Sequence, residues 1–446
     1  MHAFFTLLSS LGWFLVTLGL LVSFHEWGHF LAARAFRIEV LRFSVGFGKA
    51  VWERRLRSGM LLTVAWIPLG GYVRMLDTRQ DEVPEGQRHR AYDQQRPWKR
   101  MVVAAAGPLA NVVFALAAFW TMGVLGTPDF VPVIAAPTGV AQAAGFREGD
   151  TLTSVNGRPV RTWGEAVFAL GTAVSAGNDG RISLIREGRP LLLTLPLADA
   201  GTHDRPLSDI GLSLKPVDTE AVIREVRAGL PAARAGLLPG DRLEAINGQP
   251  ATSFLDFGEL LQKEAARQSD VVISVRRQGN IQKIPLRAEQ EERSGKPRWI
   301  IGVLGPDPHN ALLRFGPLES VGFAWRTTVD TLSMTGQTLG RMLWGSASRD
   351  NLSGPVTIAQ EAKQSADMGL SWFLRFLGLV SLSLAFMNLL PLPVLDGGHI
   401  LIDAVEIVRG RPAPIRVLVA FQQTGIALLV ALMSLALWND MARLIG

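Results

Sequence analysis

The residues His-Glu-Trp-Gly-His at 25–29 have the types and the spacing of a metal-hydrolase site. On an α-helix, two histidines four residues apart project from one face and can bind one zinc ion. The glutamate beside the first histidine lies on an adjacent face and can act as general base toward the attacking water. The preceding residues, Ala3–Phe24, carry no charged side chain. A hydrolase motif at the end of such a run indicates chemistry at the depth of a membrane.

A buried histidine pair without a metal is the usual alternative explanation of this pattern. At hydrocarbon depth that alternative is weaker, because an unpaired carboxylate of Glu26 would be strongly disfavoured there. We therefore interpret the motif as a metal site.

A catalytic zinc site takes three protein ligands and a water, so a third ligand must lie elsewhere in the chain. The best candidate segment is Asn-Leu-Leu-Pro-Leu-Pro-Val-Leu-Asp-Gly-Gly-His-Ile at 388–400. Asp396 and His399 are three residues apart and lie near each other on a helix, so spacing leaves both open as the ligand. Asp396 is nearer the expected membrane interior, where acidic residues are costly and usually functional. A helix-capping role for Asp396 is the structural alternative.

Two prolines in this segment, Pro391 and Pro393, exclude a regular helix across it, because proline lacks an amide donor and crowds the preceding turn. The polar backbone that they free is tolerated at membrane depth only where it is buried in protein or lines a wet cavity. Asn388 can satisfy part of that backbone or bind the backbone of a substrate. We predict a broken helix beside the metal site.

The composition indicates that membrane-spanning helices position these residues. Hydrophobic residues make up 48% of the 446 residues and charged residues 19%, with a mean hydropathy of +0.22. This balance is too apolar for an ordinary soluble protein of this length. The chain has no cysteine, which excludes thiolate zinc ligands, disulfides and cysteine nucleophiles. Four stretches are long enough to cross roughly 30 Å of hydrocarbon: Ala3–Ala33, Met101–Gly126, Leu370–Leu395 and Val417–Trp438.

The distribution of basic residues predicts the orientation. Between Arg34 and Arg100 there are 14 Lys and Arg against 7 Asp and Glu, and a second basic cluster precedes the fourth stretch. The positive-inside rule places both loops in the cytoplasm, and both termini and residues 127–369 outside. The metal motif and Asp396 then lie at cytoplasmic span ends, at one depth. The net charge of +6 follows from this topology and not from nucleic-acid binding, since no basic-aromatic platform is present.

The outer segment contains an internal repeat with an offset of 91 residues, in which 143–160 aligns with 234–251 and 182–189 with 273–280. Each copy has short β-type runs, an Asn-Gly turn and one helical stretch, which predicts two α+β modules of one kind. Each copy resembles a PDZ domain, a module that binds an extended chain by strand addition. Neither has a clear Gly-Leu-Gly-Phe loop. Gating of substrates by size and recognition of chain ends both stay open as their role.

The loop after the first span contains two β-type runs, 42–55 and 60–76, joined by a Ser-Gly turn. The second run is apolar but too short, and too broken by proline and glycine, to span a membrane. A hairpin that dips into the membrane can pair with an unwound substrate by strand addition, and a surface hairpin without substrate contact is the alternative. Gly46 and Gly48 ease close approach of a chain in either case, which makes them candidate substrate-binding residues.

Together, these motifs resemble the site-2 intramembrane metalloprotease family, and within it the bacterial members with two PDZ domains inserted between the second and third spans. The resemblance covers nearly the whole chain and keeps the motif order. It implies a zinc ion bound by His25, His29 and Asp396, with Glu26 as general base, and a substrate held by Asn388 and the neighbouring prolines. The motifs that carry it are HEWGHF at 25–30, GPLAN at 107–111, NLSGPVTIAQ at 351–360 and NLLPLPVLDGGH at 388–399.

The resemblance also implies a function. It predicts a zinc endopeptidase of the bacterial inner membrane, with its active site toward the cytoplasm and its PDZ domains in the periplasm, that acts in regulated intramembrane proteolysis and stress response. The expected partners are the lipid bilayer and a single-pass membrane protein, either an anti-sigma factor or a remnant signal peptide. A non-enzymatic scaffold that binds chain ends through its PDZ domains is the competing function. A metal transporter is a weaker one, because the few intramembrane polar groups converge on one site.

We therefore predict a polytopic α-helical membrane protein with four transmembrane helices, a membrane-associated β-hairpin and two extracytoplasmic α+β PDZ domains. The predicted segments are a first transmembrane helix (1–36), a β region (37–97), a second transmembrane helix (98–126), two PDZ domains (127–217 and 218–307), an amphipathic linker (308–369), a third transmembrane segment (370–408) and a fourth transmembrane helix (409–446).

Overall fold

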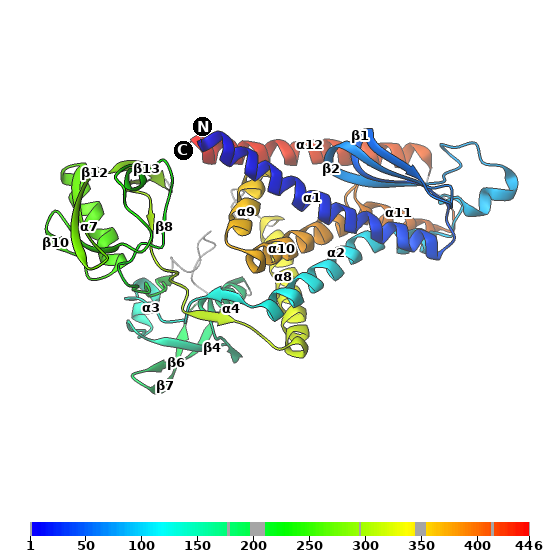
Figure 1. The fold of residues 1–446 in the computed structure, drawn as a ribbon. Helices are drawn as coiled ribbons and strands as arrows, with labels where there is room; N and C mark the ends of the chain where they lie inside the picture. The colour runs from blue at the N-terminus through cyan, green and yellow to red at the C-terminus, as the bar shows by residue number, and fades with distance from the viewer. Residues whose placement is uncertain are drawn as a thin grey trace.

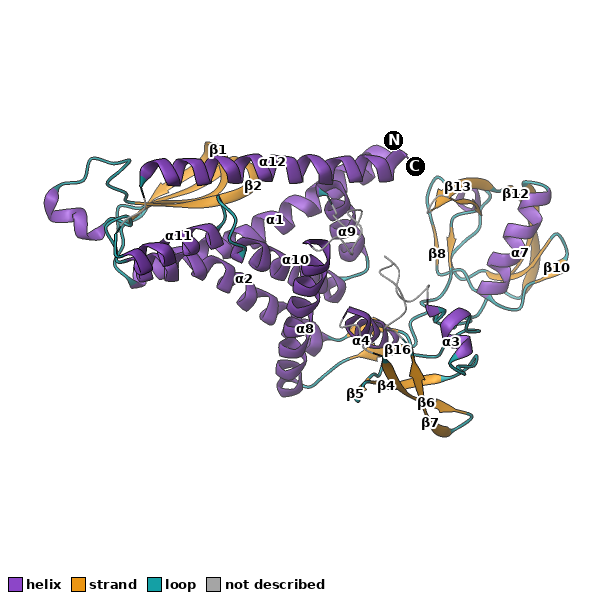
Figure 2. Ribbon diagram, turned by 180° about the vertical axis from the view of Figure 1, so that it is seen from behind, coloured by secondary structure: helices purple, strands orange, loops and turns teal. Residues whose placement is uncertain are grey.

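Long helices occupy the middle of the molecule, with a β-hairpin at one end and two small α+β modules at the other (Figure 1). Figure 2 shows the same arrangement from behind. The structure is a computed structural model, and it describes residues 2–175, 179–196, 210–293, 296–343, 354–411 and 414–445.

Among the described residues, three helices are long and apolar enough to cross a membrane. They are α1 (His2–Ala35), α2 (Pro97–Leu125) and α10 (Leu370–Leu389), and each coincides with most of one predicted span. The fourth predicted span falls in α12 (Ile415–Ile445), where a shorter apolar stretch covers Arg416–Ala431. Three spans are therefore supported, and the fourth stays a prediction.

Helix α2 is the centre of the helical part and packs against α1, α10, α8 (Pro317–Leu343) and α11 (Asp396–Arg409). Proline occupies its first position, where no amide donor is needed. The side chain of Phe119 in α2 is fully buried in a hydrophobic cluster with residues of α8 and α10. α2 therefore links the site-bearing helices to the modules.

Helices α1 and α2 approach each other closely at Gly28. A Cβ atom added there would lie 2.2 Å from the carbonyl oxygen of Ala106 and 2.7 Å from the Cβ of Ala110. Small residues at such a crossing allow helix backbones to pack directly in a membrane. The glycine of the zinc motif thus brings the two histidines onto the surface of α2.

The third predicted span ends earlier than expected. α10 stops at Leu389, and Asp396 is the first residue of a separate helix, α11. The break between the two helices confirms the predicted broken helix, because the prolines between them interrupt the hydrogen-bond ladder. Val394 in the connection has φ +82°, a conformation that β-branched residues rarely adopt.

The segment predicted as a linker contains two helices, α8 and α9 (Pro355–Asp367). α9 packs on α1 and α10. The carboxylate of Asp440, in the last part of α12, accepts hydrogen bonds from the backbone N–H groups of Gly354 (3.0 Å) and Val356 (2.9 Å) at the start of α9. α12 is thereby attached to α9. The first three residues of the 351–360 motif lie outside the described residues.

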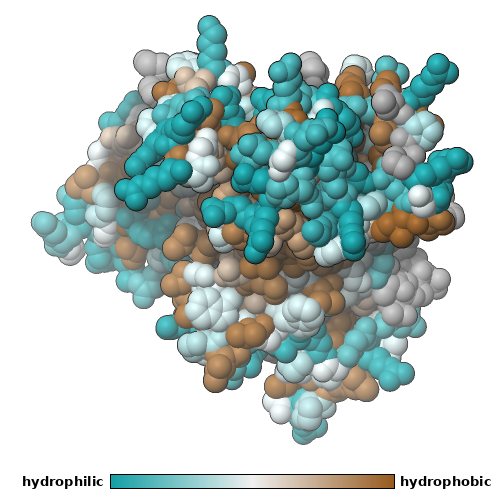
Figure 3. Space-filling view, turned by 90° about the vertical axis from the view of Figure 1, so that its right-hand side faces the viewer, coloured by the Kyte–Doolittle hydropathy of each residue, from teal (hydrophilic) through white to brown (hydrophobic). Residues whose placement is uncertain are grey.

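The two β-type runs of the loop after α1 form the hairpin of β1 (Val40–Arg55) and β2 (Leu61–Met75), as predicted. Both strands bend, so that the first half of β1 lies between two parts of β2, with Phe43 opposite both Leu62 and Val73. Figure 3 looks at this end of the molecule and shows hydrophilic side chains over its upper half, with hydrophobic surface between and below them.

The bend of β1 depends on two glycines. Gly46 has φ +91° and Gly48 has φ +88°, in the region that favours glycine. A Cβ atom at Gly46 would lie 2.8 Å from the carbonyl oxygen of Ile67. These residues therefore shape the hairpin.

The internal repeat corresponds to two four-stranded antiparallel sheets with the same strand order, each with one longer helix and one short helix, α3 (Gly139–Ala143) or α6 (Pro231–Arg234). An ion pair recurs at the repeat spacing, Asp150–Arg186 at 2.7 Å and Asp241–Arg277 at 2.6 Å. Burial acts to raise the pKa of each carboxyl, but hydrogen bonds from arginine and backbone outweigh it, and both pKa values lie below the usual range. The first sheet has the order β5-β4-β6-β7 with α4 and the second the order β10-β9-β11-β12 with α7, over these bounds: β4 Thr151–Val155, β5 Arg158–Pro159, α4 Trp163–Ser175, β6 Gly180–Arg186, β7 Arg189–Leu195, β9 Arg242–Ile246, β10 Gln249–Pro250, α7 Phe254–Arg267, β11 Asp270–Arg277 and β12 Asn280–Arg287.

The first module is attached to the helical part through α8. Arg158 forms an ion pair with Asp330 of α8, and the hydroxyl of Thr172 in α4 lies 3.5 Å from the sulfur of Met334. α8 in turn packs on α2, whose Trp120 donates to the carbonyl of Pro317 at 3.0 Å. The position of the first module is therefore coupled to α2.

Candidate metal centre

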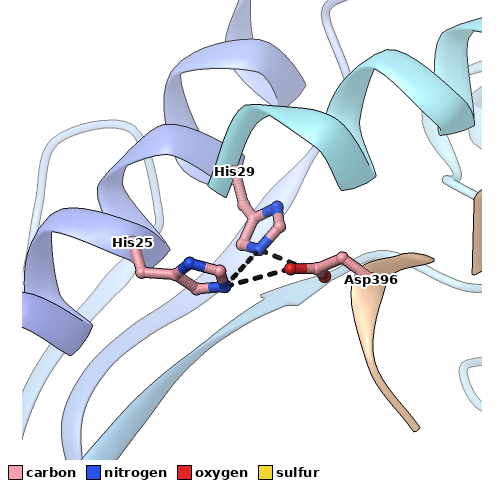
Figure 4. Close-up of side chains that lie close together, drawn as sticks. All are labelled: His25, His29 and Asp396. Atoms are coloured by element: carbon pink, nitrogen blue, oxygen red, sulfur yellow. Dashed lines mark hydrogen bonds and ion pairs between the residues drawn. The ribbon is translucent and has the colours of Figure 1, made fainter. Parts of the chain in front are cut away.

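His25, His29 and Asp396 converge at one point, with their ligand atoms within 4.8 Å of one another (Figure 4). The two Nε2 atoms are 3.2 Å apart, and the carboxylate oxygens lie 3.1 Å from Nε2 of His25 and 3.4 Å from Nε2 of His29. Ligand atoms on a tetrahedral zinc, with bonds of about 2.0–2.2 Å, lie roughly 3.3 Å apart. The donor types and their separations therefore fit zinc.

Three elements bring these ligands together. The histidines share one face of α1, and Asp396 enters at the first turn of α11. Behind them, α2 presents Gly107, where a Cβ atom would lie 2.3 Å from Nε2 of His29 and 2.8 Å from Cε1 of His25. Only glycine leaves room at this position for both rings.

The outer nitrogens of the two imidazoles face α2. Nδ1 of His29 lies 2.8 Å from the carbonyl oxygen of Val103, and Nδ1 of His25 lies 3.4 Å from the side-chain amide of Asn111. Such contacts fix ring orientation, and the carbonyl acceptor at Nδ1 of His29 leaves its Nε2 for a metal.

Glu26 lies beside the ligands in a cleft of about 430 Å³. Its carboxylate accepts a hydrogen bond from the backbone of Val73, and a Cβ atom at Gly71 would lie 3.5 Å from its Cγ. β2 thus forms one wall of the cleft, and its residues 72–75 line it together with His29 and Asp396.

Of the two sequence candidates for the third ligand, the structure brings Asp396 to the histidines. His399 lines the same cleft but does not belong to the three-residue cluster.

The predicted substrate-binding residues lie outside this cleft's lining. Asn388 is in the last turn of α10, and Pro391 and Pro393 are in the connection to α11. Pro393 contacts α12, since a Cβ atom at Gly425 would lie 2.3 Å from its Cβ. Gly46 and Gly48 lie at the hairpin bend. Their roles toward a substrate stay predictions.

Sequence reasoning used the GPLAN segment only as a family signal and missed the roles of Gly107 and Asn111. A buried amide inside an apolar span was the available signal, because polar side chains there are costly. It also missed residues 72–75, whose position depends on how the hairpin folds back on α1.

A buried ion cluster attaches α11 to α2. Arg100 lies 2.7 Å from the carboxylate of Asp403 and also pairs with Glu406, and the three side chains are 14%, 8% and 10% exposed. Burial raises the pKa of Asp403 to about 6, although Arg100 acts to lower it. The cluster holds the helix that begins with Asp396.

Comparison with known proteins gives consistent matches over nearly the whole chain. Residues 13–432 match the family described as Peptidase family M50. A putative zinc metalloprotease of Xylella fastidiosa is 35% identical over 97% of this chain and 99% of its own length. The regulator of sigma-E protease RseP of Salmonella typhimurium is 36% identical over 98% of this chain and 100% of its own length, and that of Escherichia coli is 35% identical over 97% and 98%.

Replacing Gly107 by alanine should abolish metal binding, because the new methyl group would overlap the ring of His29. We expect Gly107→Ala protein to retain no stoichiometric zinc when its metal content is measured after purification in detergent. Gly19→Ala is the matched control, since nothing lies within 4 Å of a Cβ atom there in α1. Normal zinc content in Gly107→Ala would contradict the close contact.

Replacing Arg100 by methionine should strongly destabilise the protein, because two buried carboxylates lose their counter-charge. We expect the free energy of unfolding to fall by about 3–5 kcal/mol, measured by chemical denaturation in detergent. The control is Arg234→Met, which removes a pair whose side chains are 55% and 46% exposed and should cost about 0–1 kcal/mol. Equal losses in the two variants would show that the cluster does not anchor α11.

Proposed function

This chain belongs to peptidase family M50 and is a zinc metalloprotease, and from that premise we propose that it hydrolyses a peptide bond within or near the transmembrane segment of a single-pass membrane protein. The observation that carries the proposal is the convergence of His25, His29 and Asp396 at the end of an apolar helix, with Glu26 facing the same cleft. Family membership sets aside the non-enzymatic scaffold and the metal transporter.

We assign the zinc ion to His25, His29 and Asp396. When bound, zinc polarises the scissile carbonyl and increases the acidity of a water molecule. Glu26 takes the proton from the attacking water and passes it to the leaving amine. The Val73 backbone holds the carboxylate of Glu26 at the cleft wall, so that the base is positioned before the substrate arrives.

The substrate must lose its helical hydrogen bonds before hydrolysis, because a transmembrane helix hides its carbonyl groups in its own ladder. We propose that residues 71–75 of β2 supply the replacement partners. Within the described residues this stretch pairs with 40–45 on one side, and its other side borders the cleft. An unwound segment added along this edge would pass directly beside Glu26.

We further propose a role in regulated proteolysis at the bacterial inner membrane. This rests on the two relatives named as regulators of sigma-E protease, which match the chain from end to end. The expected substrate is an anti-sigma factor, and a remnant signal peptide is the second substrate class. The basic residues around the hairpin support a cytoplasmic active site and periplasmic modules.

The two modules would then control access from the outer side. The ion pair of Arg158 with Asp330 couples the first module to α8, and through α8 to α2. A module held at the outer end of a span is suited to exclude substrates with bulky outer domains. Recognition of a new chain end by strand addition remains the second way in which it can act.

Replacement of the general base tests the proposed function. We expect Glu26→Gln to slow cleavage of a single-pass test substrate by about 10²–10⁴-fold, because the water loses its proton acceptor. Zinc content should be unchanged, since Glu26 is not one of the three ligands. Cleavage should be followed in detergent by fragment analysis, with Glu53→Gln in β1 as the control. Wild-type cleavage by Glu26→Gln protein would exclude this role for Glu26.

Cross-linking tests the strand edge, and the absence of native cysteine makes single-cysteine variants clean. In a Glu26→Gln background, we expect Arg74→Cys to form a disulfide with a cysteine near the scissile bond of the substrate. Arg54→Cys is the matched control, because residue 54 pairs on the opposite side of the hairpin, with Leu62. Stronger cross-linking from position 54 would place the substrate on the other edge.

A further inference from the structure

Asn111 is a fully buried amide in the middle of α2, next to the metal centre. Its Nδ2 lies 3.4 Å from Nδ1 of His25, while its Oδ1 is buried without a hydrogen-bond partner. The backbone carbonyl of Asn111 accepts a hydrogen bond from Ser381 of α10 at 2.8 Å. The amide is therefore held against His25 with its acceptor unused.

Zinc coordination through Nε2 requires that the other ring nitrogen, Nδ1, carries the proton and donates it. His29 meets this requirement, because its Nδ1 faces the carbonyl oxygen of Val103 at 2.8 Å. His25 faces an amide whose nitrogen and oxygen have nearly the same shape, so the amide can occupy the same space turned by 180°. In the turned orientation Oδ1 accepts from Nδ1–H of His25, so the acceptor that is buried without a partner gains one.

We propose that Asn111 is the positioning residue that sets the tautomer of His25. Without metal, its Nδ2 donates to Nδ1 of His25, and the ring proton is on Nε2. With zinc, the amide is turned, Oδ1 accepts from Nδ1–H, and Nε2 is free to bind. This inference rests on the proposed assignment of zinc to His25, His29 and Asp396.

The face of α2 explains why one helix serves both histidines. Residues 103, 107 and 111 recur every four positions, as His25 and His29 do on α1. Val103 meets His29, Asn111 meets His25, and Gly107 lies between the two rings. The helices run in opposite directions, so the pairs follow in reverse order. His29 uses a backbone acceptor, whereas His25 depends on a side chain, and that side chain can be tested by mutation.

The test measures zinc affinity by chelator competition on the full chain in detergent. We expect Asn111→Leu, which keeps the volume but has no acceptor, to bind zinc about 10–100-fold more weakly. Asn111→Asp restores an acceptor and should bind zinc at least as tightly as wild type. The control Ser381→Ala removes a hydrogen bond from the same residue but leaves the amide, and should keep wild-type affinity.

Wild-type affinity in Asn111→Leu, or equal weakening in Asn111→Leu and Asn111→Asp, would overturn the inference. If Asn111→Leu does not fold, ¹⁵N-histidine NMR of the zinc-loaded wild type decides: the inference requires a proton on Nδ1 of His25, and a proton on Nε2 refutes it. Failure of the wild type itself to bind zinc would instead refute the proposed site. The two failures are therefore distinguishable.

Discussion

Polar groups at membrane depth must find their partners inside the protein, because hydrocarbon offers none. This constraint shapes the helical part of the molecule. Nδ1 of His29 uses a backbone carbonyl of α2, and in the first turn of α2, at the end of the predicted span, the buried Arg100 is enclosed by two carboxylates of α11. Each of these contacts also fixes a residue of the metal centre. The same hydrogen bonds and ion pairs therefore satisfy the buried polar groups and position the residues of the metal centre.

The same constraint requires close packing around the site. Gly28 lets α1 approach the backbone of α2, and Gly107 leaves space for both imidazoles. A side chain at either position would separate the helices and open the contacts that orient the rings. The prolines before Asp396 end α10 and allow α11 to begin at the site, so its acidic residue reaches the histidines from a helix terminus.

Under the proposed function, a substrate that entered from the bilayer would meet the same constraint, since its backbone would exchange one set of hydrogen bonds for another. The strand edge at 71–75 lies against Glu26 and offers such partners at the place where hydrolysis would occur. On the opposite end of the molecule the first module is coupled to α2 through α8. The metal centre and the first module are therefore both connected to α2, the module through α8.

Sequence alone determined features that depend on local spacing: the paired histidines on one helical face, the hairpin, the broken third helix and the repeated module. The geometry of the helix and strand backbone fixes which side chains share a face, and this repeat can be recognised within a few residues of sequence. Tertiary structure decided the rest. It brought Asp396, and not His399, to the two histidines, placed Gly107 and Asn111 beside their rings and put one edge of the hairpin along the cleft. These outcomes depend on which helix faces meet across hundreds of residues, and no local period encodes such packing.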